Sequence, residues 1–374
     1  MIQVLDFLNR MKEQGIDFYT GVPDSLLASF CACIDDNHKH SQHLIAANEG
    51  NAIALAIGYH MASQRIPVVY MQNSGLGNTI NPLVSLADPK VYKVPILLII
   101  GWRGEPDIAD EPQHKKQGEI TLSQLEILNI PYWILSCNCD YSSVLNEAFS
   151  SLRNRNAPVA LVVRKDTFLK YNKNREVPNS SATLLRENAI EQLLDLFTEK
   201  DLVISTTGKT SRELFELREK RGHPQRDFMT VGGMGHASSI ALGVCIGQPN
   251  RRVICLDGDG AMIMHMGALP VIGKFQPKNF IHILLNNESH ESVGGQVTAS
   301  THINYKKLAD SVGYKVFAQA NSISDLTRAW SKVISVNGPA LLEIKIKVGS
   351  RDDLGRPTTS AEDNKNAFMK FAND

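Results

Sequence analysis

The stretches VICLDGDGAM (Val253–Met262) and HILLNN (His282–Asn287) decide the fold class of this chain. Each is a short apolar run that ends in polar residues, and 25 residues (261–285) separate the GDG triplet from the two asparagines. Short apolar strands spaced by helices are typical of a parallel sheet that is covered on both faces. Because the crossover returns the chain beside the first strand, Asp259 and Asn287 are expected at one carboxyl edge, where such sheets bind ligands.

The chemistry of these two side chains points to a cation and a phosphate. Carboxylate and amide oxygens suit Mg²⁺, which takes the rest of its shell from phosphate oxygens and water. The pair therefore predicts a metal-bridged diphosphate site. The alternative interpretation is a turn with a capping aspartate and an Asn-rich loop.

The pattern of apolar runs extends over the whole chain of 374 residues. Helices are predicted between short strands in both halves, and a polar stretch without periodicity lies between the halves. We therefore expect two similar open parallel-sheet α/β domains, at 1–170 and 188–374, joined by a linker at 171–187. The expected strands are at 66–72, 94–100, 157–168, 201–206, 251–257, 280–286 and 339–348.

Composition argues against several classes of partner. Lys+Arg and Asp+Glu both total 39 and no long charged block occurs, so no nucleic acid or membrane partner is expected. The N-terminal segment reads as an amphipathic helix rather than a signal peptide, and no apolar run approaches the roughly 18 residues of a membrane span. Six cysteines without zinc-site spacing indicate reduced thiols and a cytoplasmic location.

Two nucleotide-binding motifs are nearly, but not completely, present. TTGKTS (206–211) ends like a P-loop, but Val203 stands where the first glycine belongs. GGMGHASS (232–239) has Ser238 in place of the third glycine of the dinucleotide motif. An NTP- or NAD-dependent enzyme is therefore the weaker alternative.

The GDG triplet, the 25-residue interval and the NN pair together resemble the cofactor-binding motif of the thiamine diphosphate-dependent enzymes. The resemblance implies the thiamine diphosphate-binding fold without a middle domain, with the pyrimidine-binding domain first. It also implies Mg²⁺ ligation by Asp259, the Asn287 side chain and the main-chain carbonyl of Ser289. The cofactor-binding residues that it implies, or that adjoin its motifs, are Gly208, Lys209, Thr210, Gly233, Met234, Gly258, Gly260 and Ala261, with Met234 holding the cofactor in its bent shape.

The first half carries a segment that is similar to the one with the family's activating glutamate, AANEGNAIALAIGYHMAS (46–63). The resemblance implies that Glu49 contacts the aminopyrimidine ring and activates the thiazolium carbon. The alternative is an ordinary acidic residue at a helix N-terminus, where the helix dipole favours negative charge.

Five segments together resemble the family of phosphonopyruvate and sulfopyruvate decarboxylases: 21–27, 101–118, 286–296, 350–358 and 364–371. This implies decarboxylation of 3-phosphonopyruvate to phosphonoacetaldehyde and CO₂. Asp24 and His114 are then proton-handling catalytic residues, although either could be an ordinary loop residue. Arg351 and Arg356 are candidates for binding the phosphonate, and His290 for facing the substrate.

The resemblance further implies a homo-oligomer, a dimer or larger, with sites between subunits. Sulfopyruvate is the alternative substrate. A cofactor-binding subunit without turnover is the alternative from another class, but it predicts loss of the activating glutamate, and Glu49 is present.

Overall fold

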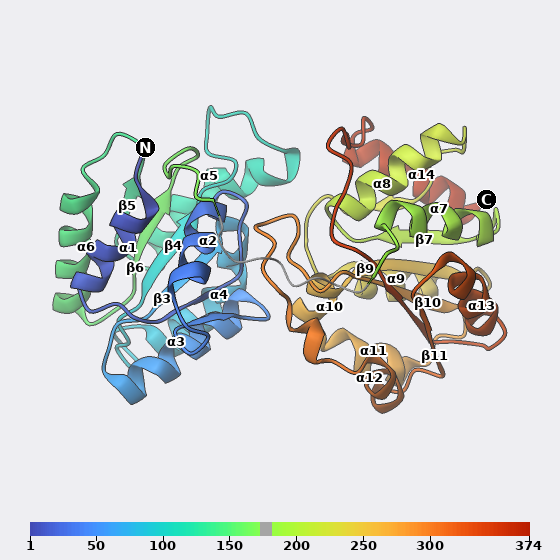
Figure 1. Cartoon of the computed structure of the whole chain (residues 1–374), viewed down its shortest axis with the longest axis horizontal. Coiled ribbons are helices and arrows are strands. Elements are labelled where there is room, and N and C mark those ends of the chain that lie inside the picture. Colours follow the sequence, from blue (N-terminus) through green and yellow to red (C-terminus); the bar gives the residue numbers. More distant parts are fainter. Residues whose placement is uncertain (173–181) are drawn as a thin grey trace. The chain divides into compact units, whose positions relative to one another are not determined.

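The computed structural model describes residues 1–172 and 182–374, which form two compact α/β units (Figure 1). Of the described residues, the first unit contains 1–172 and 293–296, and the second contains 182–292 and 297–374. Most of the linker predicted at 171–187 lies outside the described residues.

The first unit alternates strands and helices from its N-terminus. Its elements are α1 (Val4–Glu13), β1 (Tyr19–Gly21), α2 (Ala28–Asn37), β2 (His43–Ile45), α3 (Glu49–Ser63), β3 (Val68–Gln72), η1 (Asn73–Gly75), α4 (Leu76–Pro82), η2 (Leu83–Ala87), β4 (Leu97–Gly101), α5 (Pro112–Ile127), β5 (Tyr132–Leu135), α6 (Tyr141–Arg155) and β6 (Val159–Val163).

The second unit repeats the alternation. Its elements are α7 (Arg186–Leu196), β7 (Leu202–Ser205), α8 (Lys209–Lys220), β8 (Phe228–Met229), α9 (Ala237–Gly247), β9 (Val253–Gly258), α10 (Asp259–Met264), α11 (Ala268–Phe275), β10 (Phe280–Asn286), η3 (Ala299–His302), α12 (Tyr305–Val312), β11 (Val316–Ala320), α13 (Ile323–Ile334), β12 (Ala340–Lys345) and α14 (Ala361–Asn373).

Both units contain a six-stranded parallel sheet, and the two sheets have the same topology. The strand order is β2-β1-β3-β4-β6-β5 in the first unit. In the second it is β8-β7-β9-β10-β12-β11, which is the same order when the strands of each unit are counted from one to six. The expected fold class, two similar open parallel-sheet α/β domains, is confirmed.

The seven expected strands are all present, although the one expected at 157–168 ends at Val163, but the interior strand β1 and the four edge strands β2, β5, β8 and β11 were not predicted. The reason is partial burial and short length. In β5, for example, only Leu135 is fully buried, and β8 spans only two residues. A strand that is open on one side lacks the continuous apolar run by which a central strand is recognised.

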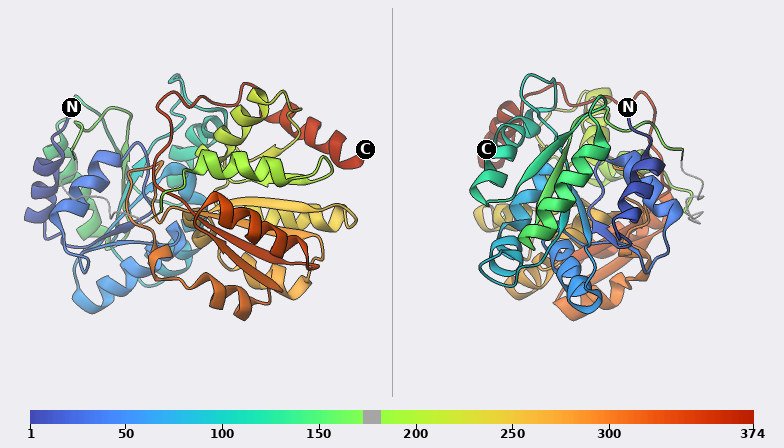
Figure 2. Two further views of the ribbon diagram at one scale, coloured as in Figure 1. Left: turned by 45° about the vertical axis from the view of Figure 1, so that its right-hand side comes forward. Right: turned by 90° about the vertical axis from the view of Figure 1, so that its left-hand side faces the viewer.

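Each sheet buries both faces under helices. In β4, Leu97 and Ile99 pack with α1, α2 and α6, whereas Leu98 and Ile100 pack with α3 and α5 on the opposite face. Figure 2 shows these helices on the two sides of the first sheet. Burying each such side chain contributes about 1.5–3 kcal/mol relative to its exposure.

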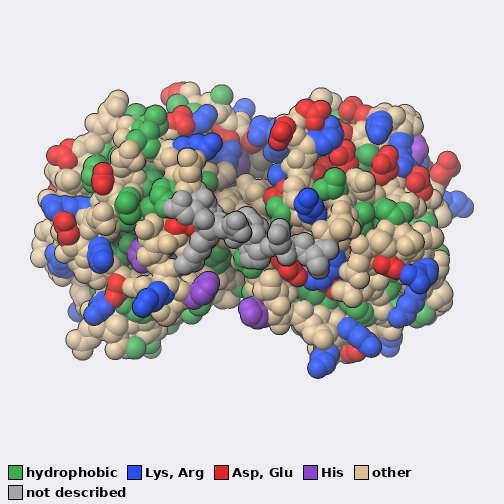
Figure 3. Space-filling view, in the orientation of Figure 1, with side chains coloured by type: hydrophobic (Ala, Val, Ile, Leu, Met, Phe, Trp, Pro, Cys, Tyr) green, Lys and Arg blue, Asp and Glu red, His purple; other side chains and the backbone are tan. Residues whose placement is uncertain are grey.

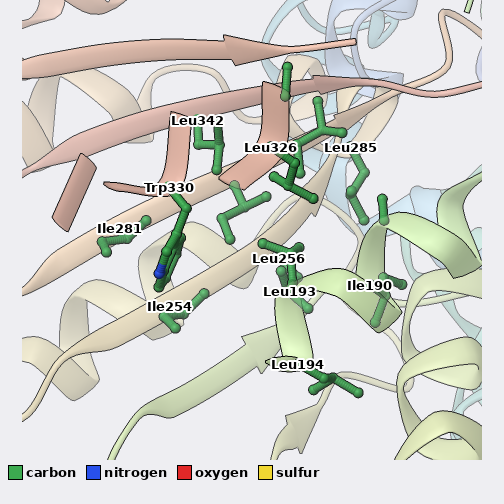
Figure 4. Close-up of a cluster of buried hydrophobic side chains, with 14 of the residues drawn as sticks. Ile190, Leu193, Leu194, Ile254, Leu256, Ile281, Leu285, Leu326, Trp330 and Leu342 are labelled. Carbon is green, nitrogen blue, oxygen red and sulfur yellow. The ribbon is translucent and has the colours of Figure 1, made fainter. Parts of the chain in front are cut away.

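The second unit follows the same rule. Figure 4 shows one of its cores, in which Leu326 and Trp330 of α13 pack with Ile254 and Leu256 of β9 and with Leu193 of α7. The other face of the same sheet, with Val253 and Cys255 of β9, is covered by α9, α11, α12 and α14.

Charged side chains of both signs are interspersed on the face of each unit that Figure 3 shows. Among the described residues, no helix has the length and apolar character required to cross a membrane.

Candidate functional site

In the second unit, Asp259 and Asn287 follow neighbouring strands. Strands β9 and β10 pair in parallel, with Gly258 opposite Leu285. Asp259 is the first residue of α10, and Asn287 follows the last residue of β10. The backbone N–H of Asn287 lies close enough to the Asp259 carboxylate to lower its pKa. The structure thus brings together the two predicted ligands at one carboxyl edge.

The Asp259 carboxylate is buried and has no cationic side chain as a partner among the described residues. Burial raises its pKa to about 6, although Thr298 and the backbone N–H groups of Asp259, Asn287 and Gly260 oppose this rise. Thr298 Oγ1 donates a hydrogen bond of 2.5 Å to Asp259 Oδ2. A buried carboxylate without a counter-ion is unfavourable, so this side chain fits a bound divalent cation.

The aspartate that precedes the GDG triplet, Asp257, faces the interior. It lies 3.3 Å from His282 Nε2, and His282 Nδ1 lies 3.1 Å from the Tyr314 hydroxyl. Both Asp257 and His282 are fully buried. The end of the strand separates the two acids, since Asp257 still belongs to β9 and is buried in the core, whereas Asp259 lies beyond the strand and begins α10.

The loop that follows Asn287 contains the third predicted ligand, Ser289. Asn287 Oδ1 accepts a 3.1 Å hydrogen bond from the Ser289 backbone N–H. Glu288 between them has a φ of 58°, in the left-handed region that non-glycine residues rarely adopt. Its side chain is held by Lys345 Nζ at 2.7 Å. Strained backbone of this kind clusters at functional sites.

Glu291 holds this loop through several hydrogen bonds, and no pattern in the sequence singles this residue out. Asn287 Nδ2 donates to Glu291 Oε2 at 2.9 Å, and Lys209 Nζ donates to Oε1 at 2.8 Å. Arg186 Nη1 also donates to Oε2 at 2.9 Å, and the guanidinium binds Glu213 through two further bonds of 2.8 and 2.9 Å. Because its Nδ2 is bound to Glu291, the Asn287 amide directs its oxygen away from Glu291.

The two glycine-bearing segments predicted for the diphosphate reach the same edge. Gly208, with a φ of 93°, precedes α8, whose first residues are Lys209 and the buried Thr210. Helix N-termini at such an edge favour phosphate groups. Gly235 packs closely on α10, since a Cβ there would lie 2.9 Å from the Ala261 carbonyl oxygen. This contact brings the segment that contains Gly233 and Met234 beside the helix that Asp259 begins.

The three predicted substrate-binding residues lie in different surroundings. The His290 ring packs on Gly260, and burial lowers its pKa to about 4, so the ring is neutral at pH 7. Arg351 is paired with Glu187 at 3.0 Å, with Asp353 at 2.9 Å and with Glu216. Arg356 is exposed. The C-terminal segment contacts the Asn287 loop at Gly349, whose N–H donates to Glu291 Oε1 at 3.1 Å.

In the first unit, Glu49 is the first residue of α3 and is buried. Asn48 caps this helix by accepting from the Asn51 N–H at 3.0 Å. Asn78 Nδ2 donates a 2.7 Å hydrogen bond to Glu49 Oε2. A side chain at Gly75 would meet the Glu49 carboxylate at 2.4 Å, so glycine leaves the room that this carboxylate occupies.

Asp24 follows β1 and is fully buried next to β3. Gln72 Nε2 donates a 2.7 Å hydrogen bond to Asp24 Oδ1, whereas Oδ2 has no partner among the described residues. A Cβ at Gly101 would lie 2.2 Å from Oδ2. Burial raises the pKa of Asp24, against smaller opposing effects of Gln72 and Arg103. The Asp24 carboxyl group therefore keeps its proton at pH values above the usual pKa of an aspartate.

Replacement of Asp24 by asparagine is expected to stabilise the protein increasingly as pH rises. Because the native pKa is above the unfolded value, the wild type loses stability as pH rises from the unfolded pKa through the native pKa, and asparagine removes this loss. Urea unfolding at several pH values between 4 and 9 measures the difference, with the exposed Asp6→Asn as the control. A difference that is independent of pH would contradict the assignment.

Arg103 lies among Asp24, Asp110 and His114. It is bound by Asp110 through Nε at 2.8 Å and through Nη2 at 2.5 Å, and its Nη1 donates to Ser25 Oγ at 3.0 Å. Burial lowers the pKa of His114, and the Arg103 charge lowers it further. The structure thus brings both predicted proton-handling residues within electrostatic range of one guanidinium.

Close backbone contact fixes His114 in this place. A Cβ at Gly104 would lie 1.9 Å from the His114 carbonyl oxygen, and a Cβ at Gly118 would lie 1.6 Å from the Gly104 carbonyl oxygen. The Trp102 indole N–H also donates to the Gly118 carbonyl at 3.0 Å. Helix α5 and the loop after β4 therefore form one rigid element.

A cavity of about 590 Å³ opens beside this cluster. Its lining includes Ser25 after β1, Arg103 and Asp110 after β4, and residues 165–170 after β6. The cavity therefore lies at the carboxyl edge of the first sheet.

Comparison with known proteins agrees with this geometry. The C-terminal TPP binding domain of the thiamine pyrophosphate enzymes matches residues 206–344, and their N-terminal TPP binding domain matches residues 5–127. The chain is 32% identical to phosphonopyruvate decarboxylases of Streptomyces viridochromogenes and Streptomyces hygroscopicus, over 99% and 100% of this chain and 95% of each relative. It is 26% identical to a sulfopyruvate decarboxylase of Methanosarcina acetivorans, over 94% of this chain and 93% of that protein. The chain belongs to the thiamine pyrophosphate enzymes, in the family that contains the phosphonopyruvate decarboxylases.

Proposed function

We propose that this chain is a thiamine diphosphate- and Mg²⁺-dependent decarboxylase that converts 3-phosphonopyruvate to phosphonoacetaldehyde and CO₂. The observation that carries the proposal is the near-full-length similarity to phosphonopyruvate decarboxylases, combined with a buried Asp259 carboxylate that lacks a cationic partner among the described residues. The similarity supports the reaction, and the carboxylate supports the metal.

The residues of the second unit would hold the cofactor through its metal. Asp259, the Asn287 amide oxygen and the Ser289 carbonyl would supply the protein ligands of Mg²⁺, and phosphate oxygens would complete the shell. The N-terminus of α8, with Lys209 and Thr210, would face the diphosphate. When bound, thiamine diphosphate supplies an electron sink for the pair left by the departing carboxylate.

The residues of the first unit would donate and accept protons during the reaction. Glu49, held by Asn78, would bind the aminopyrimidine ring of the cofactor. Asp24, whose burial favours its protonated form, would deliver a proton at the substrate carbon after CO₂ leaves. His114 is neutral at pH 7 because burial lowers its pKa, and it would then act as a hydrogen-bond partner rather than as a cation.

Steady-state rates on three keto acids test the substrate assignment. Phosphonopyruvate, sulfopyruvate and pyruvate are each supplied to the purified protein with thiamine diphosphate and Mg²⁺, and CO₂ release is measured. We expect kcat/KM to be highest for phosphonopyruvate and activity to be lost when Mg²⁺ is chelated. A more than tenfold preference for sulfopyruvate, about 1.4 kcal/mol in barrier, would reassign the chain to the alternative that its Methanosarcina relative represents. Cofactor binding without CO₂ release from any of the three acids would indicate a non-catalytic subunit.

Replacement of Glu291 by glutamine is expected to weaken Mg²⁺ and cofactor binding about 10- to 100-fold, the usual effect of losing a residue that orients a metal ligand. Glutamine has one amide oxygen, so it can accept either from Asn287 and Arg186, which donate to Oε2, or from Lys209, which donates to Oε1, and its NH₂ would face the other donors. The loop that carries Asn287 would therefore lose part of its support together with the negative charge. Titration of the protein with Mg²⁺ at saturating thiamine diphosphate, followed by tryptophan fluorescence, measures the change.

Glu213→Gln is the matched control, because Glu213 binds the same Arg186 but has no bond to Asn287 or Lys209. We expect it to lower thermal stability with less than a threefold change in Mg²⁺ affinity. Equal losses of affinity in the two variants would show that Glu291 acts through general stability alone.

We further propose that the protein is a cytoplasmic homo-oligomer of at least two chains. Its six cysteines are all free and four of them are buried, which suits a reducing compartment. The resemblance to the thiamine enzymes supports the assembly, and sedimentation equilibrium tests it.

A further inference from the structure

The cavity of the first unit lies beside the point where parallel sheets of this topology bind ligands. The chain runs from β1 to β2 on one side and then to β3 on the other side, so β1 and β3 form the point at which the strand order reverses. Ligands bind outside the carboxyl ends of the strands at such a point. Asp24, which follows β1, and Gln72, the last residue of β3, are hydrogen-bonded to each other there, and Ser25, next to Asp24, lines the cavity.

Polar side chains continue from this point along the sheet edge to the cavity. Asn73 follows β3, and its Nδ2 donates to the Arg103 carbonyl at 2.8 Å, while the Arg103 N–H donates to Asn73 Oδ1 at 3.2 Å. The order of groups along the edge is therefore Glu49 after β2, Asp24 after β1, and Arg103 after β4. A molecule that reacts at Asp24 would have Glu49 on one side and Arg103 on the other.

Arg103 is oriented by its neighbours and keeps donors for a ligand. A guanidinium has five N–H groups, and the bonds to Asp110 and Ser25 use three of them. Its side chain is 20% exposed and lines the cavity. Because the carboxylate holds the guanidinium plane, little side-chain entropy is lost when the remaining N–H groups bind a ligand.

The charged side chains around the cavity decide whether it favours an anion or a cation. Asp110 is paired with Arg103, and Glu105 is paired with Arg164, so these two carboxylates are neutralised. At the rim, the exposed Lys165 and Lys170 outnumber Asp166. The remaining balance favours an anion with several acceptor oxygens.

We propose that this cavity binds the anionic group at carbon 3 of the substrate, the phosphonate in the assignment above, and that Arg103 is the residue that recognises it. The inference rests on the proposed function for the identity of the substrate. The group at carbon 3 is one carbon from the reacting keto carbon, which suits a guanidinium within electrostatic range of both Asp24 and His114. A tetrahedral oxyanion matches the two-pronged geometry of the free N–H groups.

Arg351 is one of the two arginines, with Arg356, that the sequence predicts for this role. Its guanidinium is instead surrounded by three carboxylates, from Glu187, Glu216 and Asp353. A dianion would have to displace these partners, whereas at Arg103 it would use donors that remain available.

The test combines turnover with binding of a probe that cannot react. Arg103→Met removes the charge at similar length, Arg103→Lys keeps it without the planar fork, and Arg65→Met is the control, since Arg65 pairs with Asp17 at the surface outside the cavity. KM and kcat for phosphonopyruvate, the dissociation constant of thiamine diphosphate, and that of methylphosphonate (by calorimetry, on the holoprotein) are measured for each variant.

We expect Arg103→Met to raise KM for phosphonopyruvate and the dissociation constant of methylphosphonate about 10- to 150-fold, since a charge-assisted hydrogen bond contributes roughly 1.5–3 kcal/mol. Arg103→Lys should recover part of this loss. The affinity for thiamine diphosphate should change less than threefold, and Arg65→Met should behave as the wild type. Unchanged methylphosphonate binding in both Arg103 variants would overturn the proposal.

Two readouts keep this inference separate from the proposed function. A wild type that binds methylphosphonate through Arg103 but does not decarboxylate phosphonopyruvate would contradict the function and retain the cavity. A wild type that decarboxylates phosphonopyruvate, with KM unchanged in Arg103→Lys and Arg103→Met, would support the proposed function and contradict the assignment of the cavity. If Arg103→Met does not fold, Arg103→Lys alone decides, because lysine cannot reproduce two parallel hydrogen bonds.

Discussion

Replacement of Glu49 by glutamine is expected to lower kcat on phosphonopyruvate about 10²- to 10⁴-fold, the range that a positioned acid or base contributes. Glutamine has the same shape and can keep the hydrogen bond from Asn78. It cannot hold or release the proton that the proposed role requires. The affinity for thiamine diphosphate should therefore change little while turnover is lost.

Exchange of the cofactor's thiazolium C2 proton with deuterium, followed by NMR after rapid quenching, measures the lost step directly. In the wild type the exchange should be fast, and in Glu49→Gln it should approach the rate of free thiamine diphosphate. Glu119→Gln, an exposed position on α5, is the control for a change of charge in the same unit. Near-normal exchange in Glu49→Gln would show that its carboxylate is only a helix-terminal charge.

Replacement of Asp259 by alanine is expected to abolish binding of Mg²⁺ and of thiamine diphosphate together. The variant loses a buried anionic ligand, and no other described carboxylate contacts Asn287 except Glu291, which is already bound to Arg186 and Lys209. We expect a loss of at least about 10³-fold in cofactor affinity, equivalent to roughly 4 kcal/mol.

Thermal unfolding makes this loss visible without turnover. Ligand at 100 times its dissociation constant stabilises a protein by about 2.7 kcal/mol, and this stabilisation should be absent in Asp259→Ala. Without cofactor the variant should be at least as stable as the wild type, because it no longer buries a carboxylate that lacks a cationic partner. Asp325→Ala, which changes an acidic residue in the first turn of α13, should keep the full response. A normal response in Asp259→Ala would remove this residue from the metal site.

Mixing the two inactive variants tests the shared site. If Glu49 and Asp259 of one site come from different subunits, subunit exchange produces dimers with one intact site. Random reassortment should then restore about one quarter of wild-type activity. If one chain supplies both residues, no activity should return.

Much of the fold could be predicted because the central strands carry continuous apolar runs. The strands β4, β9 and β10 are buried on both faces, and this requirement appears directly in their residues. The four edge strands could not be predicted, since a strand with one open side does not need a continuous apolar run, and β1 could not be predicted because it has only three residues, YTG. Strand order depends on how the crossovers pack, and no local pattern records it.

Some residues of the candidate site could likewise be predicted from the sequence, and others could not. Asp259 and Asn287 were predictable as a pair because each directly follows a recognisable strand, and neighbouring strands bring their carboxyl ends together. The roles of Glu291 and Arg103 were not predictable. Their partners, such as Arg186 for Glu291 and Ser25 for Arg103, are 105 and 78 residues away along the chain.

The residues of the chain are thus sufficient to predict two parallel α/β units, the aspartate–asparagine pair of the second and a glutamate at a helix start of the first. The folded structure adds the groups that orient the site residues: Arg186 and Lys209 bind Glu291, Ser25 accepts from Arg103, and Glu187 and Glu216 bind Arg351. Each of these contacts joins residues that are at least 78 positions apart in the chain. Burial and capping act over a few residues and leave a pattern in the sequence, whereas contacts between distant segments exist only after the strands have been ordered in the sheet.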